Sequence, residues 1–210
     1  GLLSTVAWQV GVERSYAYEG SVFVAGALIQ WLRDGLKLFA HAAESEALAQ
    51  QASDSGGVVI VPAFVGLGAP YWNERVRGAI FGLTRDTGPA QLARAALEAV
   101  AHQVADLCET PELATVRSIR IDGGMSRNQL FCQILADLTG RTVEPAALVE
   151  MTAAGAAAIA AFGAGLFNDT ESLERDFVPR ELGTEQPRRF DVLLGAEARE
   201  NARARWRLAI

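Results

Sequence analysis

The sequence predicts an α/β fold in which a mixed sheet is flanked by helices. After an opening pair of strand-like segments, short apolar runs alternate with helical patterns along the chain. Half of the 210 residues are hydrophobic and 21% are charged, a composition that lets a chain of this size bury a core without disulfides. We see no internal repeat, and we expect one domain over residues 1–168 and a polar extension with a terminal helix over residues 169–210.

The first segments predict a hairpin followed by a buried helix. Residues 3–9 and 12–18 have strand-like composition and meet around Gly11, which favours a tight turn. Ser21 can cap a helix that continues to residue 39, and its apolar composition predicts burial over most of its length. A short polar helix over residues 44–53 should follow.

The middle of the chain predicts two strands separated by an aromatic loop. The strands are expected over residues 58–64 and 79–84, and the loop over 66–78 contains Tyr71 and Trp72. Such a loop could be a lid or an interface, but loops of this kind more often pack on their own domain. A long helix should then cover residues 89–109, because proline is tolerated at a helix start.

The next elements are a strand, a helix and a short strand. Residues 118–124 predict a strand that ends in two glycines, and Ser126 opens a helix with one apolar face. Gly140 suits the C-terminal cap of that helix. Residues 141–145 should form the following strand.

The last two predicted helices differ in character. Residues 151–167 are rich in alanine and glycine and too short for a membrane span, so we expect a buried helix packed closely against a sheet or another helix. The terminal helix, over about residues 189–207, has several charges that most simply form a solvated face. They are Arg199, Glu200, Arg203, Arg205 and Arg207.

Charge and cysteine content exclude several classes of protein. The net charge of −6 disfavours nucleic acid or an anionic membrane as a partner. Cys108 and Cys132 show no metal-ligand spacing and read as reduced core thiols, which is consistent with the cytoplasm. His102 on an alanine-rich helix is more simply structural than catalytic. The chain opens with neither a signal peptide nor a methionine, so we expect it to be part of a longer protein.

Asp122-Gly123-Gly124 supplies the strongest candidate ligand site. A strand that ends in glycines before a helix start presents backbone N–H groups to an anion, and the glycines allow close approach. Asn128, in the first helical turn, could reach a nucleobase or ribose. A tight turn without any ligand is the alternative, since neither of the common glycine-rich phosphate motifs is present.

Gly26 and Gln30 supply the second candidate. They lie four residues apart and therefore on one face of the first helix. An amide buried among apolar side chains needs hydrogen-bond partners, and a ligand passing over Gly26 would provide them. The alternative is a bond from Gln30 to neighbouring backbone.

Several segments together resemble the C-terminal domain of the FGGY carbohydrate kinases, which have the ribonuclease H-like fold of actin-like ATPases. The run from Arg77 to Arg85, with Gln91-Leu92 and residues 95–98 downstream, is similar to the second family signature. Further similarities, especially to members that phosphorylate a small polyol, lie in residues 18–26, 29–34, 62–64 and 66–72 and in the Asp122-to-Asn128 turn.

The resemblance implies a nucleotide site formed by Gly26, Gln30, Gly123, Gly124 and Asn128. It implies ATP and Mg²⁺ as cofactors and phosphoryl transfer to a polyol or sugar hydroxyl in a cleft between two domains. The catalytic Asp and most substrate contacts of this family lie upstream of such a domain, so we assign no catalytic residue and no metal ligand here. The chain alone should be inactive, and its exposed partner-facing wall predicts self-association.

Three alternatives remain at this point. The chain could be a regulatory or interaction module that kept the fold without the chemistry. It could belong to a kinase of a sugar such as xylulose or gluconate. An actin-like chaperone or scaffold ATPase would share the glycine turn but not the pattern from Arg77 to Glu98.

Overall fold

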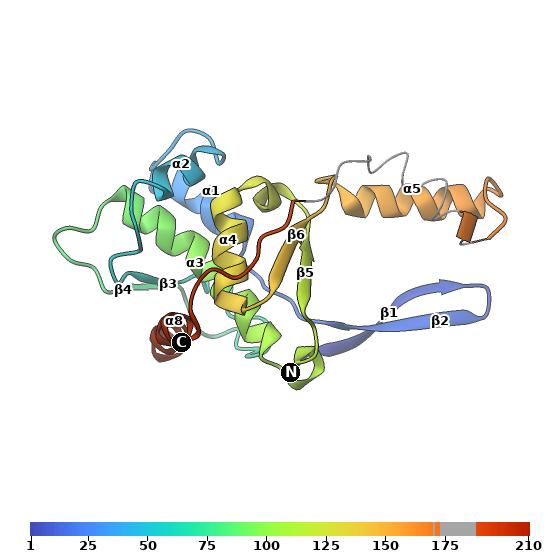
Figure 1. Ribbon diagram of the computed structural model, residues 1–210, viewed down its shortest axis with the longest axis horizontal. Coiled ribbons are helices and arrows are strands. Elements are labelled where there is room, and N and C mark those ends of the chain that lie inside the picture. Colours follow the sequence, from blue (N-terminus) through green and yellow to red (C-terminus); the bar gives the residue numbers. More distant parts are fainter. Residues whose placement is uncertain (170, 173–187) are drawn as a thin grey trace.

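The structure, a computed structural model, describes residues 1–169, 171–172 and 188–210. It confirms an α/β fold, but the described strands form three separate two-stranded sheets: β1 with β2, β3 with β4, and β5 with β6 (Figure 1). The strands span Leu3–Val10, Glu13–Glu19, Val59–Val61, Ala79–Phe81, Ser118–Ile121 and Thr142–Pro145. The α-helices are α1 Gly26–Asp34, α2 Glu44–Ala49, α3 Pro89–Cys108, α4 Gln129–Thr139, α5 Met151–Gly163 and α8 Ala196–Ala209.

Helix α3 is the centre of the core. It contacts α1, α2, α4 and β3, and half of its buried residues are alanines, whose small side chains let neighbouring helices approach closely. Pro89 opens the helix as expected, and Gly140 ends α4 with a φ of 66°, the left-handed conformation predicted for its cap. The core predicted from apolar patterning therefore forms around one long helix.

Strands β5 and β6 are parallel, and β5 leads to the glycine turn. Asp122 follows the last residue of β5, and Gly123 adopts a φ of 79°, which favours glycine. Phe190 forms an antiparallel bridge with Val143 of β6, so residues near the C-terminus pack on this sheet. Whether residues 169–210 form a separate extension stays a prediction, and part of that range lies outside the described residues.

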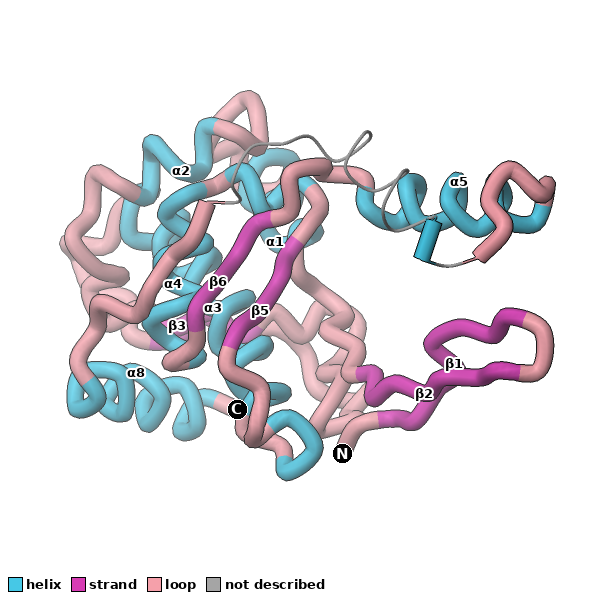
Figure 2. Tube along the Cα trace, turned by 45° about the vertical axis from the view of Figure 1, so that its right-hand side comes forward, coloured by secondary structure: helices cyan, strands magenta, loops and turns pink. Residues whose placement is uncertain are grey.

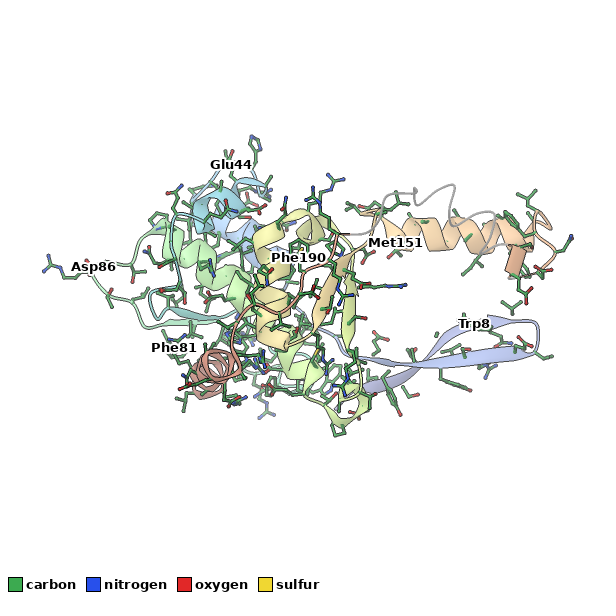
Figure 3. All side chains as sticks on the ribbon, in the orientation of Figure 1. Trp8, Glu44, Phe81, Asp86, Met151 and Phe190 are labelled. Carbon is green, nitrogen blue, oxygen red and sulfur yellow. The ribbon has the colours of Figure 1, made fainter. Side chains whose placement is uncertain are left out.

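The predicted hairpin is confirmed, with Gly11 at a φ of 58° in its turn. It projects from the body of the molecule in the same direction as α5 (Figure 2). Trp8 lies on this projecting hairpin, and Met151 lies where α5 begins (Figure 3). Several apolar side chains of the β1–β2 hairpin are exposed: Leu3, Val6, Trp8, Val12, Tyr16 and Tyr18.

The prediction of a helix from Ser21 is wrong, because α1 begins at Gly26. The Ser21 carbonyl accepts a hydrogen bond from the N–H of Ala69 at 2.9 Å. Gly68 lies so close that a Cβ there would come within 2.0 Å of the same carbonyl oxygen. The aromatic loop thus packs on its own domain and contacts the segment before α1.

The prediction that the alanine-rich helix is buried is also wrong. No residue of α5 is buried, and Ile159 is 69% exposed. A composition rich in alanine and glycine allows close packing, but it does not predict whether a helix is buried. No helix among the described residues is long and apolar enough to span a membrane.

Terminal helix α8 is held to α3 by buried polar contacts, so the solvated-face prediction is wrong for Arg203. Its side chain is 2% exposed and forms an ion pair with Asp106. Trp206, one turn further along α8, is fully buried and donates from Nε1 to Asp106 Oδ2 at 2.8 Å. Cys108 and Cys132 are buried free thiols, as expected.

Candidate functional site

The five predicted nucleotide-binding residues line one pocket of about 640 Å³. Its walls come from α1, α2, the 3₁₀ turn Gly124–Arg127 and the start of α4. The volume lies within the range of about 300–1,000 Å³ that small-molecule sites occupy. The structure thus brings together residues that are about 100 positions apart in the sequence. They are Gly26, Gln30, Gly123, Gly124 and Asn128.

The glycines keep the pocket wall open. A Cβ at Gly26, Gly123 or Gly124 would have no atom within 4 Å, so packing within the chain does not require glycine at these positions. Gly123 additionally needs its positive φ. A ligand can therefore approach the backbone of α1 and of the turn at these places.

Asn128 has a defined orientation because it caps α4. Its Oδ1 accepts the N–H of Phe131 at 2.8 Å, which leaves the amide NH₂ as the free donor of that side chain. The expected helix start at Ser126 is wrong: residues 124–127 form a 3₁₀ turn, and α4 begins at Gln129. Ser126 donates its hydroxyl to the Gly123 carbonyl at 2.7 Å and so braces the turn.

The burial argument for Gln30 is wrong. The side chain belongs to an exposed residue that lines the open pocket, so its amide does not require a ligand to satisfy it. Gln30 nevertheless lines the pocket together with Gly26, as the sequence predicts. The pattern of apolar residues around Gln30 misled because one stripe of α1 faces the pocket rather than the core.

Sequence reasoning missed the contribution of α2. Ser45 and Glu46 of α2, with Ala42 just before it, line the pocket. Glu46 Oε1 accepts the N–H of Leu130 at 3.1 Å and so joins α2 to the start of α4. A short polar helix gives no local signal for such a contact, because its partner lies 84 residues away.

The charged residues that line the pocket are Glu46, Asp122 and Arg127. Within the described ranges no three potential metal-ligating side chains gather into a cluster. Mg²⁺ is often held by one or two carboxylates together with substrate phosphates, so a nucleotide site does not require such a cluster. The donor groups present, amides and one guanidinium, fit a phosphorylated ligand.

A second pocket of about 300 Å³ lies between β3, α3, α4 and α8. Burial raises the pKa of Glu98 on its wall, although Arg94 pairs with that carboxylate at 3.1 Å. None of the predicted nucleotide-binding residues line it. The larger pocket is therefore the candidate site.

The fold is that of the actin-like ATPases, and its structural neighbours are kinases. The chain superposes on a crystal structure of Plasmodium falciparum glycerol kinase with ADP at a TM-score of 0.83 and 28% identity, covering all of this chain and 41% of that one. It also superposes on a xylulose kinase from Rhodospirillum rubrum at a TM-score of 0.68 and 26% identity, covering 92% of this chain and 39% of that one.

The chain belongs to the FGGY family of carbohydrate kinases, whose C-terminal domain model matches residues 1–164. It is 48% identical to a glycerol kinase from Xanthobacter autotrophicus over its whole length, which is 42% of that relative. It is 46% identical to glycerol kinase 1 of Pseudomonas aeruginosa, again over all of this chain and 41% of that protein. The chain thus spans about two fifths of the length of these relatives.

Proposed function

We propose that this chain is the ATP-binding, C-terminal part of a kinase that transfers the γ-phosphoryl group of ATP to a hydroxyl of glycerol, giving glycerol 3-phosphate. The observation that carries the proposal is the convergence of Gly26, Gln30, Gly123, Gly124 and Asn128 on one open pocket. A similar structure that contains ADP supports a nucleotide as its occupant.

Glycerol is the acceptor that the comparisons favour. Relatives at 44–48% identity bear the name glycerol kinase, and the glycerol kinase structure superposes with a higher TM-score, 0.83, than the xylulose kinase, 0.68. A sugar such as xylulose or gluconate is the less supported alternative. The part of the protein beyond the matched two fifths supplies most contacts to the acceptor.

The residues of this chain bind and orient the nucleotide. The glycines admit it to the backbone, and Gln30 and the NH₂ group of Asn128 offer hydrogen bonds to the nucleoside. Bound Mg²⁺ neutralises charge on the phosphates during transfer. The carboxylate that accepts the hydroxyl proton lies outside this chain, so the chain alone binds nucleotide without turning it over. The whole protein acts in the cytoplasm and forms homo-oligomers.

Thermal denaturation with and without MgADP tests this proposal. A ligand at 100 times its Kd stabilises a protein by about 2.7 kcal/mol, so the wild-type melting temperature should rise. Gln30→Ala and Asn128→Asp should reduce that rise, and Asn128→Asp retains the cap on α4 while removing the amide donor. Gln51→Ala, at an exposed position away from the pocket, is the matched control. Unchanged wild-type melting at millimolar MgADP would refute the proposal.

A further inference from the structure

The N-terminus of α4 is already occupied by two side chains of the protein. The first N–H groups of a helix have no partner within it and attract anions. In α4, Asn128 accepts the N–H of Phe131 at 2.8 Å and Glu46 accepts the N–H of Leu130 at 3.1 Å. A phosphate group would have to displace a carboxylate to bind there.

Glu46 also brings negative charge to this side of the pocket. It is partly buried on α2, lines the pocket, and has a further donor in Gln50 Nε2 at 3.4 Å. A carboxylate repels the phosphates of a nucleotide, and the repulsion is stronger where protein screens it from water. The α2 side of the pocket therefore favours an uncharged group.

A positive charge and free N–H groups lie at the 3₁₀ turn, which follows Asp122, the other carboxylate that lines the pocket. The N–H groups of Gly124 and Met125 donate no hydrogen bond among the described residues, because they open the turn. Arg127, at the end of the same turn, is exposed, lines the pocket and has no ion-pair or hydrogen-bond partner in the described part of the chain. These groups form a site for anionic oxygens that the carboxylate of Glu46 does not occupy.

We propose that Glu46 is a positioning residue that closes the α4 N-terminus to phosphate and holds Asn128 toward the nucleoside, while Arg127 binds the phosphate chain. This inference rests on the proposed nucleotide site and deepens it, since it assigns each end of the nucleotide to one wall. Glu46 acts through the backbone of Leu130 and the Asn128 cap, and Arg127 contacts the ligand directly.

Isothermal titration of the 210-residue chain with adenosine and with MgADP separates the two roles. Glu46→Ala should weaken adenosine by about 5- to 10-fold, the order expected for losing one ordinary hydrogen bond, and MgADP by less, because the carboxylate that repels the phosphates is lost as well. Glu46→Gln should restore adenosine binding, because its amide oxygen still accepts the Leu130 N–H. Arg127→Gln should weaken MgADP by about 5- to 10-fold and leave adenosine unchanged.

Two controls match the charge changes. Arg120→Gln removes a cation from β5, where the side chain is 87% exposed, and Glu44→Gln removes an anion from α2 outside the pocket. Both should leave binding unchanged. If Arg120→Gln weakened MgADP as much as Arg127→Gln does, the effect would be one of overall charge and the inference would be wrong.

The remaining outcomes are also decisive. Absence of MgADP binding to the wild-type chain refutes the proposed function itself. MgADP binding without adenosine binding at millimolar concentration overturns the inference, as does equal weakening of both ligands by Arg127→Gln. If Glu46→Ala does not fold, Glu46→Gln decides its role: it must bind adenosine like the wild type and MgADP no more weakly.

Discussion

The rings of His102 and Trp206 stack with their centroids 5.1 Å apart and their planes inclined by 5°. His102 belongs to α3 and Trp206 to α8. Between these two helices, Arg203 Nη1 donates to the His102 carbonyl at 3.0 Å and lies 3.1 Å from His102 Nδ1. With the Arg203–Asp106 ion pair, these contacts fix α8 against the helix at the centre of the core. His102 is buried, which agrees with the structural role that the sequence predicts for it.

Asp106→Ala should lower the free energy of unfolding by about 3–5 kcal/mol, because the buried guanidinium of Arg203 loses its buried carboxylate partner and keeps only Glu109, whose side chain is 53% exposed. The Trp206 Nε1–H loses its acceptor as well. Urea denaturation followed by tryptophan fluorescence measures the change. Arg205→Ala, an exposed position on the same helix, should change stability by no more than about 0.5 kcal/mol. Equal effects of the two variants would contradict the buried role of the ion pair.

Stability should fall on the acid side of neutrality because of His102. Burial, followed by the positive charge of Arg203, lowers the pKa of His102 from 6.5 to about 3. As the pH falls through about 6.5, the unfolded state takes up a proton that the folded state does not, so folding loses up to about 1.4 kcal/mol per pH unit.

The variant His102→Gln removes this proton uptake but leaves the raised pKa of Glu98, whose burial acts in the opposite sense. Melting temperatures measured from about pH 7 down to about pH 4 should therefore fall more steeply for the wild type than for His102→Gln. Parallel profiles would show that His102 is not held neutral in the folded chain.

Gly26→Ala should weaken MgADP binding without loss of stability. Nothing lies within 4 Å of the added Cβ, which would project where the ligand is proposed to approach. Alanine is favoured over glycine in helices by up to about 1 kcal/mol, so the melting temperature should hold or rise. Gly155→Ala in α5 is the control, because its Cβ also meets no atom and it lies outside the pocket. Undiminished MgADP affinity in Gly26→Ala would place the ligand elsewhere.

The isolated chain should self-associate through the β1–β2 hairpin. A two-stranded hairpin with exposed apolar side chains is marginal alone, and Val12 is 98% and Tyr16 65% exposed. Light scattering over a range of protein concentrations should show oligomers that Val12→Ser with Tyr16→Ser weakens. Leu193→Ser, at another exposed apolar position, is the control. A monomer at every concentration would contradict this prediction.

The glycine turn was predictable because its signals are local. The turn after β5 needs the conformational freedom of glycine, and the glycines that provide it directly follow Asp122 in the sequence. The exposure of Gln30 was not predictable, because the apolar residues of α1 do not reveal which stripe of the helix faces the core. The burial of Arg203 was not predictable either, because the carboxylate that compensates its buried charge, Asp106, lies 97 residues away in the sequence.

Periodicity and motifs of neighbouring residues predict the order of strands and helices and the family resemblance, and that resemblance implies the five residues of the candidate site. Only the tertiary structure decided that α1 begins at Gly26, that α5 is exposed, and that Glu46 caps α4. Each of these depends on contacts between segments far apart in the chain: the Ser21 carbonyl with Ala69, the surroundings of α5, and Glu46 with Leu130. Local propensity carries no information about such partners.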